Sequence, residues 1–97
     1  MMNSKQRSYL RGLANKIDPI FQVGKSGISD NLIQQLNDVL EARELIKISV
    51  LETAPDGAKN LGIELSDLTN SELVQTVGNK ITLFRQKRKD SKITLPK

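Results

Sequence analysis

Hydrophobic residues recur at two different spacings along the chain, and the change from one spacing to the other predicts its elements. Three segments repeat apolar residues every three or four positions, which is the pattern of a helix with one buried face. These predicted helices cover residues 4–18, 29–43 and 57–68. Between and after them, short apolar or alternating runs predict strands at residues 20–23, 45–51, 72–77 and 80–85.

Individual residues indicate where these elements end. Ser29 is expected to cap the second helix, because its side-chain oxygen can accept a hydrogen bond from the first turn. Pro19 disfavours helical geometry at Asp18, so the first helix is predicted to stop there. The pair Gly78-Asn79 separates two alternating runs, which predicts a two-residue hairpin connection.

The order helix, strand, helix, strand, helix, strand, strand predicts an α/β fold. A helix joins the first two strands, so they are expected to pair in parallel through a right-handed crossover, whereas the closing hairpin is antiparallel. We therefore expect a mixed four-stranded sheet with helices packed on it. The 97 residues suit one domain, spanning 1–97, of which about 86–97 form a basic tail that could pair as an edge or stay loose.

Composition argues against several kinds of chemistry. The chain has no histidine and no cysteine, so it lacks the usual general base, thiol nucleophile and soft metal ligands. We therefore predict a protein that is no enzyme and uses no cofactor or metal. No continuous apolar block predicts a signal peptide or a membrane span, and the absence of cysteine fits a reducing cytoplasm.

Charge divides the chain into three parts. Residues 1–27 carry a net charge of +4, residues 28–72 carry −6, and residues 73–97 carry +6. If the two basic ends meet in space, they form a positive surface that suits a polyanion; otherwise they are two separate solvated termini. The cations that border the apolar stripe of the first predicted helix are Lys5, Arg7, Arg11 and Lys16.

The segment Gly24-Lys25-Ser26-Gly27 lies where the first predicted strand turns into the second helix. The two glycines would permit positive φ or close backbone approach, and the helix that follows directs free N–H groups at the loop, which suits an anion such as phosphate. A Walker-type site is rejected, because Pro19 stands where that motif needs a glycine. A clamp on a nucleic-acid backbone, as in KH domains, and a turn that merely needs two glycines both remain open.

Segments 10–14, 20–28, 44–48 and 78–85 together resemble the YhbY family, small bacterial single-domain members of the CRM group (chloroplast RNA splicing and ribosome maturation). The resemblance implies one CRM-type domain with a fold similar to the C-terminal domain of translation initiation factor three. It also implies RNA binding and association with precursors of the large ribosomal subunit. The positions that it marks for RNA are the loop Gly24, Lys25, Ser26 and Gly27, a basic surface beside it with Lys5, Arg7, Arg11 and Lys16, and Arg85.

The resulting hypothesis is an RNA-binding assembly factor, monomeric off the ribosome, that contacts precursor ribosomal RNA. Tyr9 and Phe21 are expected in the core, so recognition should follow RNA shape and backbone more than base sequence. An adaptor that docks a basic protein on its acidic surface is the alternative, and a DNA-binding module is a further one. The acids that would form the adaptor surface are Asp38, Glu41 and Glu44.

Overall fold

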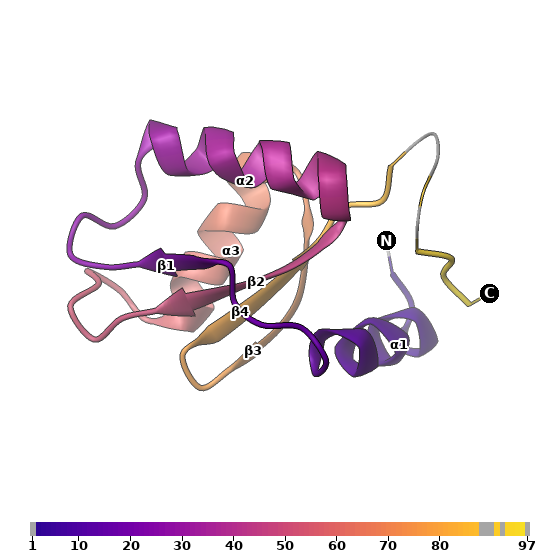
Figure 1. Ribbon diagram of the computed structural model, residues 1–97. Coiled ribbons are helices and arrows are strands. Elements are labelled where there is room, and N and C mark those ends of the chain that lie inside the picture. The colour runs from indigo at the N-terminus through magenta and orange to yellow at the C-terminus, as the bar shows by residue number, and fades with distance from the viewer. Residues whose placement is uncertain (1, 88–90, 92, 97) are drawn as a thin grey trace.

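A computed structural model describes residues 2–87, 91 and 93–96 of the chain (Figure 1). The elements follow the predicted order, which confirms the predicted fold class. They are α1 (Ser4–Ala14), β1 (Phe21–Val23), α2 (Asp30–Arg43), β2 (Leu45–Val50), α3 (Ala58–Thr69), β3 (Glu72–Val77) and β4 (Lys80–Phe84). None of the helices in the described part of the chain is long and apolar enough to cross a membrane.

The four strands form one mixed sheet in the order β1-β2-β4-β3. β1 and β2 pair in parallel through the α2 crossover, while β4 pairs antiparallel with both β2 and β3. The hairpin turns at Gly78, whose φ of +57° is accessible to glycine at little cost. The predicted parallel pair and closing hairpin are therefore confirmed.

Successive side chains along a strand point to opposite faces of the sheet, and both faces carry apolar side chains. A separate hydrophobic cluster lies on each face. α2 and α3 pack on the larger cluster, which includes Ile46 and Ile48 of β2. α1 packs on the smaller one, where Leu10 meets Leu45 and Phe84. Figure 1 shows α1 near one end of the sheet, below the layer that α2 and α3 form.

α1 ends at Ala14, four residues before the predicted end at residue 18. The ammonium group of Lys47 on β2 donates to the carbonyl oxygen atoms of Ala14, at 2.9 Å, and Ile17, at 3.4 Å. A cation at this place satisfies carbonyl groups that a helix leaves free at its carboxyl end. The chain therefore turns early and brings Ile17 onto the smaller cluster.

The two basic ends of the chain meet. Ile93 and Leu95 pack on the smaller cluster beside α1, and the Gln6 side-chain amide donates to the carbonyl oxygen of Pro96 at 3.0 Å. Residues 93–96 lie in no strand, so the part of the tail that is described packs without pairing as an edge. The rest of the tail prediction, at residues 88–90, 92 and 97, lies outside the described residues.

Candidate functional site

The segment between β1 and α2 is a tight four-residue turn. The N–H of Gly27 donates to the carbonyl oxygen of Gly24 at 2.9 Å, which closes the turn on itself. Lys25 and Ser26 stand exposed at its tip, whereas both glycines are half-buried at its base. The turn therefore exposes one ammonium group and one hydroxyl group on a short backbone segment that a hydrogen bond closes.

The two glycines serve the turn for different reasons. Gly27 has a φ of +65°, and a Cβ atom there would lie 2.9 Å from Cγ of Pro55. The φ of Gly24 is not positive; a Cβ atom there would lie 3.3 Å from a methyl group of Leu51. Within the turn, left-handed backbone is thus confined to Gly27, while Gly24 packs closely on the connection after β2.

The connection after β2, which begins at Leu51, lies against the turn. The N–H of Leu51 donates to the carbonyl oxygen of Val23 at 2.8 Å, so the two parallel strands stay paired up to the turn. On the other side, Val50 exchanges two hydrogen bonds with Asn79 of the hairpin, at 2.7 and 3.1 Å. Three connections therefore share this end of the sheet and hold the turn in place.

The amino end of α2 follows the turn directly. Ser29 caps the helix as predicted, because its hydroxyl oxygen accepts a hydrogen bond from the N–H of Leu32 at 3.1 Å. The first N–H groups of any helix have no partner inside it, which leaves those of Asp30 and Asn31 for an anion. The carboxylate of Asp30 stands at the same end, so the positive potential of this end is moderate.

The basic helix does not lie beside the turn, which corrects the arrangement expected from the sequence. α1 packs where β2 begins, at Leu45, whereas the turn packs on Leu51, just beyond the end of β2. Figure 1 shows the connection between β1 and α2 at one end of the molecule and α1 at the other. The cations of α1 and Lys25 therefore form two separate positive regions.

Two of the arginines named from the sequence bind the protein itself. Arg7 donates to the carbonyl oxygen atoms of Leu73 and Val74, at 2.6 and 2.9 Å, where β3 is irregular. Arg85 donates to Asn37 of α2 and to the carbonyl oxygen of Thr69 of α3, at 2.7–3.0 Å. Both guanidinium groups therefore join elements of the fold.

The remaining cations named from the sequence are exposed. Within the described residues, none of them forms an ion pair or a side-chain hydrogen bond: Lys5, Arg11, Lys16 and Lys25. The sequence pattern does not distinguish these exposed cations from Arg7, which is bound within the fold although it lies only one helical turn before Arg11. Sequence reasoning also passes over Arg43, which stands in the acidic middle of the chain but is exposed at the end of α2, across a cleft from Lys16.

Two expectations about side-chain exposure are wrong. Glu44 is fully buried with a φ of +68°, and its carboxylate accepts hydrogen bonds from the C-terminal segment, so it cannot belong to an exposed acidic surface. Tyr9 is 42% exposed instead of lying in the core. Periodicity places Glu44 one turn after Glu41, but α2 ends between them and the chain turns inward.

A G-x-x-G turn on a small domain is also the feature with which KH modules clamp a nucleic-acid backbone, although here the turn joins a strand to a helix. The chain belongs to the CRS1 / YhbY (CRM) domain family, whose model matches residues 2–85. The resemblance found in the sequence is therefore confirmed.

Relatives match over nearly the whole chain. The protein named "Probable RNA-binding protein YqeI" from Bacillus subtilis is 44% identical, over 99% of this chain and 100% of its own length. The solution structure of the hypothetical protein SAV1595 from Staphylococcus aureus is 50% identical, with a TM-score of 0.82, over 99% of this chain and 100% of that one. CRS2-associated factor 2, chloroplastic, from Oryza sativa subsp. japonica is 26% identical over 98% of this chain but only 16% of its own length. The same domain thus matches small proteins and part of a much larger one.

Proposed function

We propose that this protein binds RNA and acts in the cytoplasm as a non-enzymatic assembly factor on precursor RNA of the large ribosomal subunit. The observation that carries the proposal is the exposed Lys25-Ser26 tip on its closed, glycine-bounded turn. Membership of the CRM family and the RNA-binding names of its relatives support it.

The turn binds the sugar-phosphate backbone. The ammonium group of Lys25 pairs with a phosphate, the hydroxyl of Ser26 donates a hydrogen bond to it, and the N–H groups at the start of α2 add further donors. Phosphate contacts of this kind fix position without reading the base. Because the turn carries no aromatic side chain, its contribution to binding is insensitive to RNA sequence.

Arg11 of α1 and Lys16, which follows the end of α1, extend the footprint to the other end of the molecule. Arg11 and Lys16 are free to bind phosphate, whereas Arg7 and Arg85 are engaged within the fold. The molecule is 39 Å in its longest dimension, so one RNA segment that touches both ends runs along most of it. A footprint of about four to six phosphates on single-stranded RNA gives a log–log salt slope of roughly −3 to −4.

The chain offers a matched pair of double variants to test the turn. Lys25→Asp with Ser26→Asp changes the exposed tip, and Ser4→Asp with Lys5→Asp makes the same two replacements on exposed residues of α1. We expect the first double variant to lower RNA affinity at least tenfold, about 1.4 kcal/mol, and to reduce the salt slope by about 0.7. Thermal melts of both variants confirm folding.

The reverse result, loss of affinity in the α1 variant alone, would assign binding to the other end of the molecule. Binding to ribosomal particles that survives nuclease treatment would instead support an adaptor, for which Asp38 and Glu41 remain exposed on α2. Competition between RNA and single-stranded DNA of the same sequence separates an RNA-binding protein from a general single-strand binder.

A further inference from the structure

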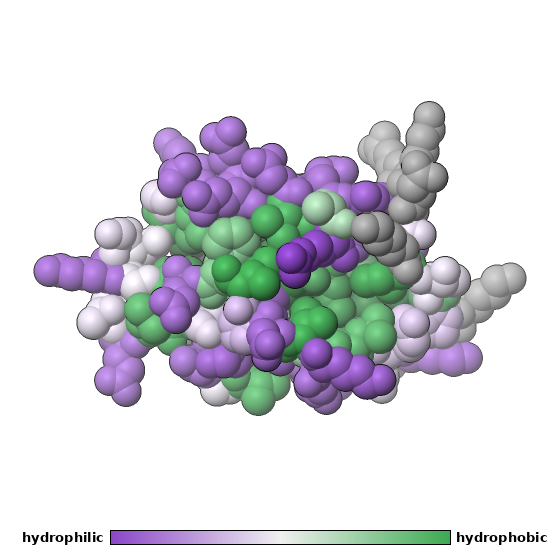
Figure 2. Space-filling view, viewed as in Figure 1, coloured by the Kyte–Doolittle hydropathy of each residue, from purple (hydrophilic) through white to green (hydrophobic). Residues whose placement is uncertain are grey.

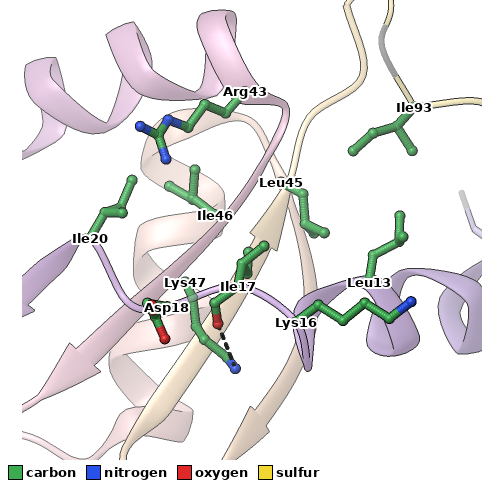
Figure 3. A pocket seen from close by; sticks show the side chains of 10 residues that line it. All are labelled: Leu13, Lys16, Ile17, Asp18, Ile20, Arg43, Leu45, Ile46, Lys47 and Ile93. Carbon is green, nitrogen blue, oxygen red and sulfur yellow. Dashed lines mark hydrogen bonds between the residues drawn. The ribbon is translucent and has the colours of Figure 1, made fainter.

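A cleft of about 640 Å³ opens where the end of α1, the start of β2 and the last turn of α2 come together (Figure 3). Aliphatic side chains form most of its surface: Leu13, Ile17, Ile20, Leu45 and Ile93. Figure 2 shows hydrophobic residues gathered in the middle of this face, with hydrophilic residues around them. The volume is that of a site for a small molecule or for one building block of a polymer.

The charges around the cleft are mostly positive. Arg43 extends over it from α2, and Lys16 stands on the α1 side (Figure 3). Both are exposed, and neither forms an ion pair within the described residues. Lys47, which binds the carbonyl groups at the end of α1, adds a third positive charge, and among the described residues that line the cleft Asp18 is the one acid. An anionic ligand with an apolar part complements this site.

β1 links the cleft to the turn of the proposed RNA interface. Ile20 borders the cleft just before β1, and Gly24 opens the turn just after β1. The three residues of β1 lie between them, so Ile20 and Gly24 are four steps of extended chain apart, which is about 13 Å. A nucleic-acid strand that binds phosphate at Lys25 therefore passes close to the cleft.

We propose that the cleft holds one unstacked nucleotide of bound single-stranded RNA, with the base against the aliphatic floor and its phosphate near Arg43. This inference rests on the proposed function. RNA-binding proteins commonly take splayed bases from single strands, most often against aromatic rings. Here Phe84 is buried, and none of the described residues that line the cleft is aromatic, so the aliphatic side chains supply the contact with the base.

Nucleotide fragments test the two parts of the ligand separately. Adenosine 5′-monophosphate should shift the backbone amide NMR signals of Ile17, Leu45 and Lys47 in a saturable way. Adenosine, which lacks the phosphate, and ribose 5-phosphate, which lacks the base, should each bind at least about fivefold more weakly. An equal response to ribose 5-phosphate would reduce the cleft to a phosphate site and overturn the proposal, as would the absence of a saturable response there.

A matched pair of variants tests the cleft with RNA itself. Ile20→Glu places a carboxylate at the cleft, and Ile63→Glu makes the same change on the outer face of α3; the two isoleucines are 38% and 47% exposed. We expect Ile20→Glu to weaken binding of short oligoadenylate at least about fivefold, and Ile63→Glu to change it less than about twofold. Arg43→Ala should weaken binding of adenosine 5′-monophosphate more than binding of adenosine.

The outcomes distinguish this inference from the proposed function. If the wild-type protein binds RNA and the Lys25→Asp, Ser26→Asp variant loses that binding while Ile20→Glu keeps it, only the cleft inference is overturned. If the wild-type protein binds no RNA, both the proposed function and the cleft inference are overturned. Saturable binding of a leucine- and glutamate-rich peptide at the cleft, with no response to the nucleotide, would make it a protein-docking site and overturn the proposal.

Discussion

The hydroxyl group of Ser91 donates a 2.7 Å hydrogen bond to the carboxylate of Glu44, which is fully buried at the end of α2. The same carboxylate accepts hydrogen bonds from the N–H groups of Lys87, at 3.0 Å, and Ile93, at 3.3 Å. One side chain therefore holds the returning C-terminal segment, and Ile93 in turn forms a wall of the cleft.

Replacing Glu44 should destabilise the fold and release this segment. Glu44→Ala removes the acceptor of the hydrogen bonds from Lys87, Ser91 and Ile93 from a buried position, so we expect a loss of about 2–4 kcal/mol in the free energy of unfolding. Glu41→Ala is the matched control, because its side chain is 71% exposed and forms a 3.4 Å ion pair with Arg85. A pair of that kind contributes about 0–1 kcal/mol.

Chemical denaturation measures both changes, and amide hydrogen exchange at Lys87 and Ile93 reports release of the segment. Equal stability of the two variants, with exchange at Lys87 and Ile93 unchanged, would contradict the role assigned to Glu44.

The two glycines of the turn should respond differently to substitution. Gly27→Ala forces an alanine into left-handed backbone, at about 1–2 kcal/mol, and brings its methyl group against Pro55. The methyl group of Gly24→Ala comes close to the end of the flexible Leu51 side chain, at 3.3 Å, and lies at an ordinary contact distance of 3.7 Å from the Thr53 hydroxyl, so a loss below about 1 kcal/mol is expected. Denaturation curves give both values. Added to Gly27→Ala, Pro55→Ala should recover the part of the stability loss that comes from the contact, but not the part that comes from left-handed backbone at an alanine. Full recovery would show that the contact alone causes the loss.

The order of elements could be predicted from the sequence because each element is marked by nearby residues. The Ser29 cap and the Gly78 hairpin are local signals of this kind. Long-range contacts have no such signal: Arg7 binds a carbonyl group 66 residues away, and Arg85 binds one 16 residues away. The residues of the turn could likewise be named, but the pattern of charge along the chain does not reveal that α1 lies at the opposite end of the sheet.

Arg7 and Arg11 lie one turn apart on α1 and should have different roles. Arg7→Ala leaves the carbonyl groups of Leu73 and Val74 without their charged donor, so we expect a loss of about 1.5–3 kcal/mol in stability. Arg11→Ala should change stability by less than about 0.5 kcal/mol but lower RNA affinity and reduce the salt slope by about 0.7. Denaturation and RNA titrations of both variants check this division, and a stability loss confined to Arg11→Ala would reverse it.

Arg85 should act as a connector of the fold and not as an RNA ligand. Arg85→Ala removes hydrogen bonds that join β4 to Asn37 of α2 and Thr69 of α3, which should cost about 2–4 kcal/mol. Arg85→Lys should recover little, since one ammonium group does not reproduce the planar fork of donors. RNA affinity, measured where each variant is fully folded, should stay within about twofold of wild type. A tenfold loss in a folded variant would restore Arg85 to the RNA interface.

The two helical glycines should respond to alanine with opposite signs. A Cβ atom at Gly12, on the exposed side of α1, meets no atom within 4 Å, so Gly12→Ala should stabilise the protein by about 0.5–1 kcal/mol through helix propensity. At Gly62 a Cβ atom would lie 3.0 Å from a methyl group of Leu73 and 3.3 Å from one of Thr76, because α3 packs closely on the sheet. Gly62→Ala should therefore destabilise by about 1–3 kcal/mol, in spite of the same gain in propensity. Thermal and chemical denaturation of the two variants measure the difference, and stabilisation by Gly62→Ala would show that α3 can move away from the sheet at little cost.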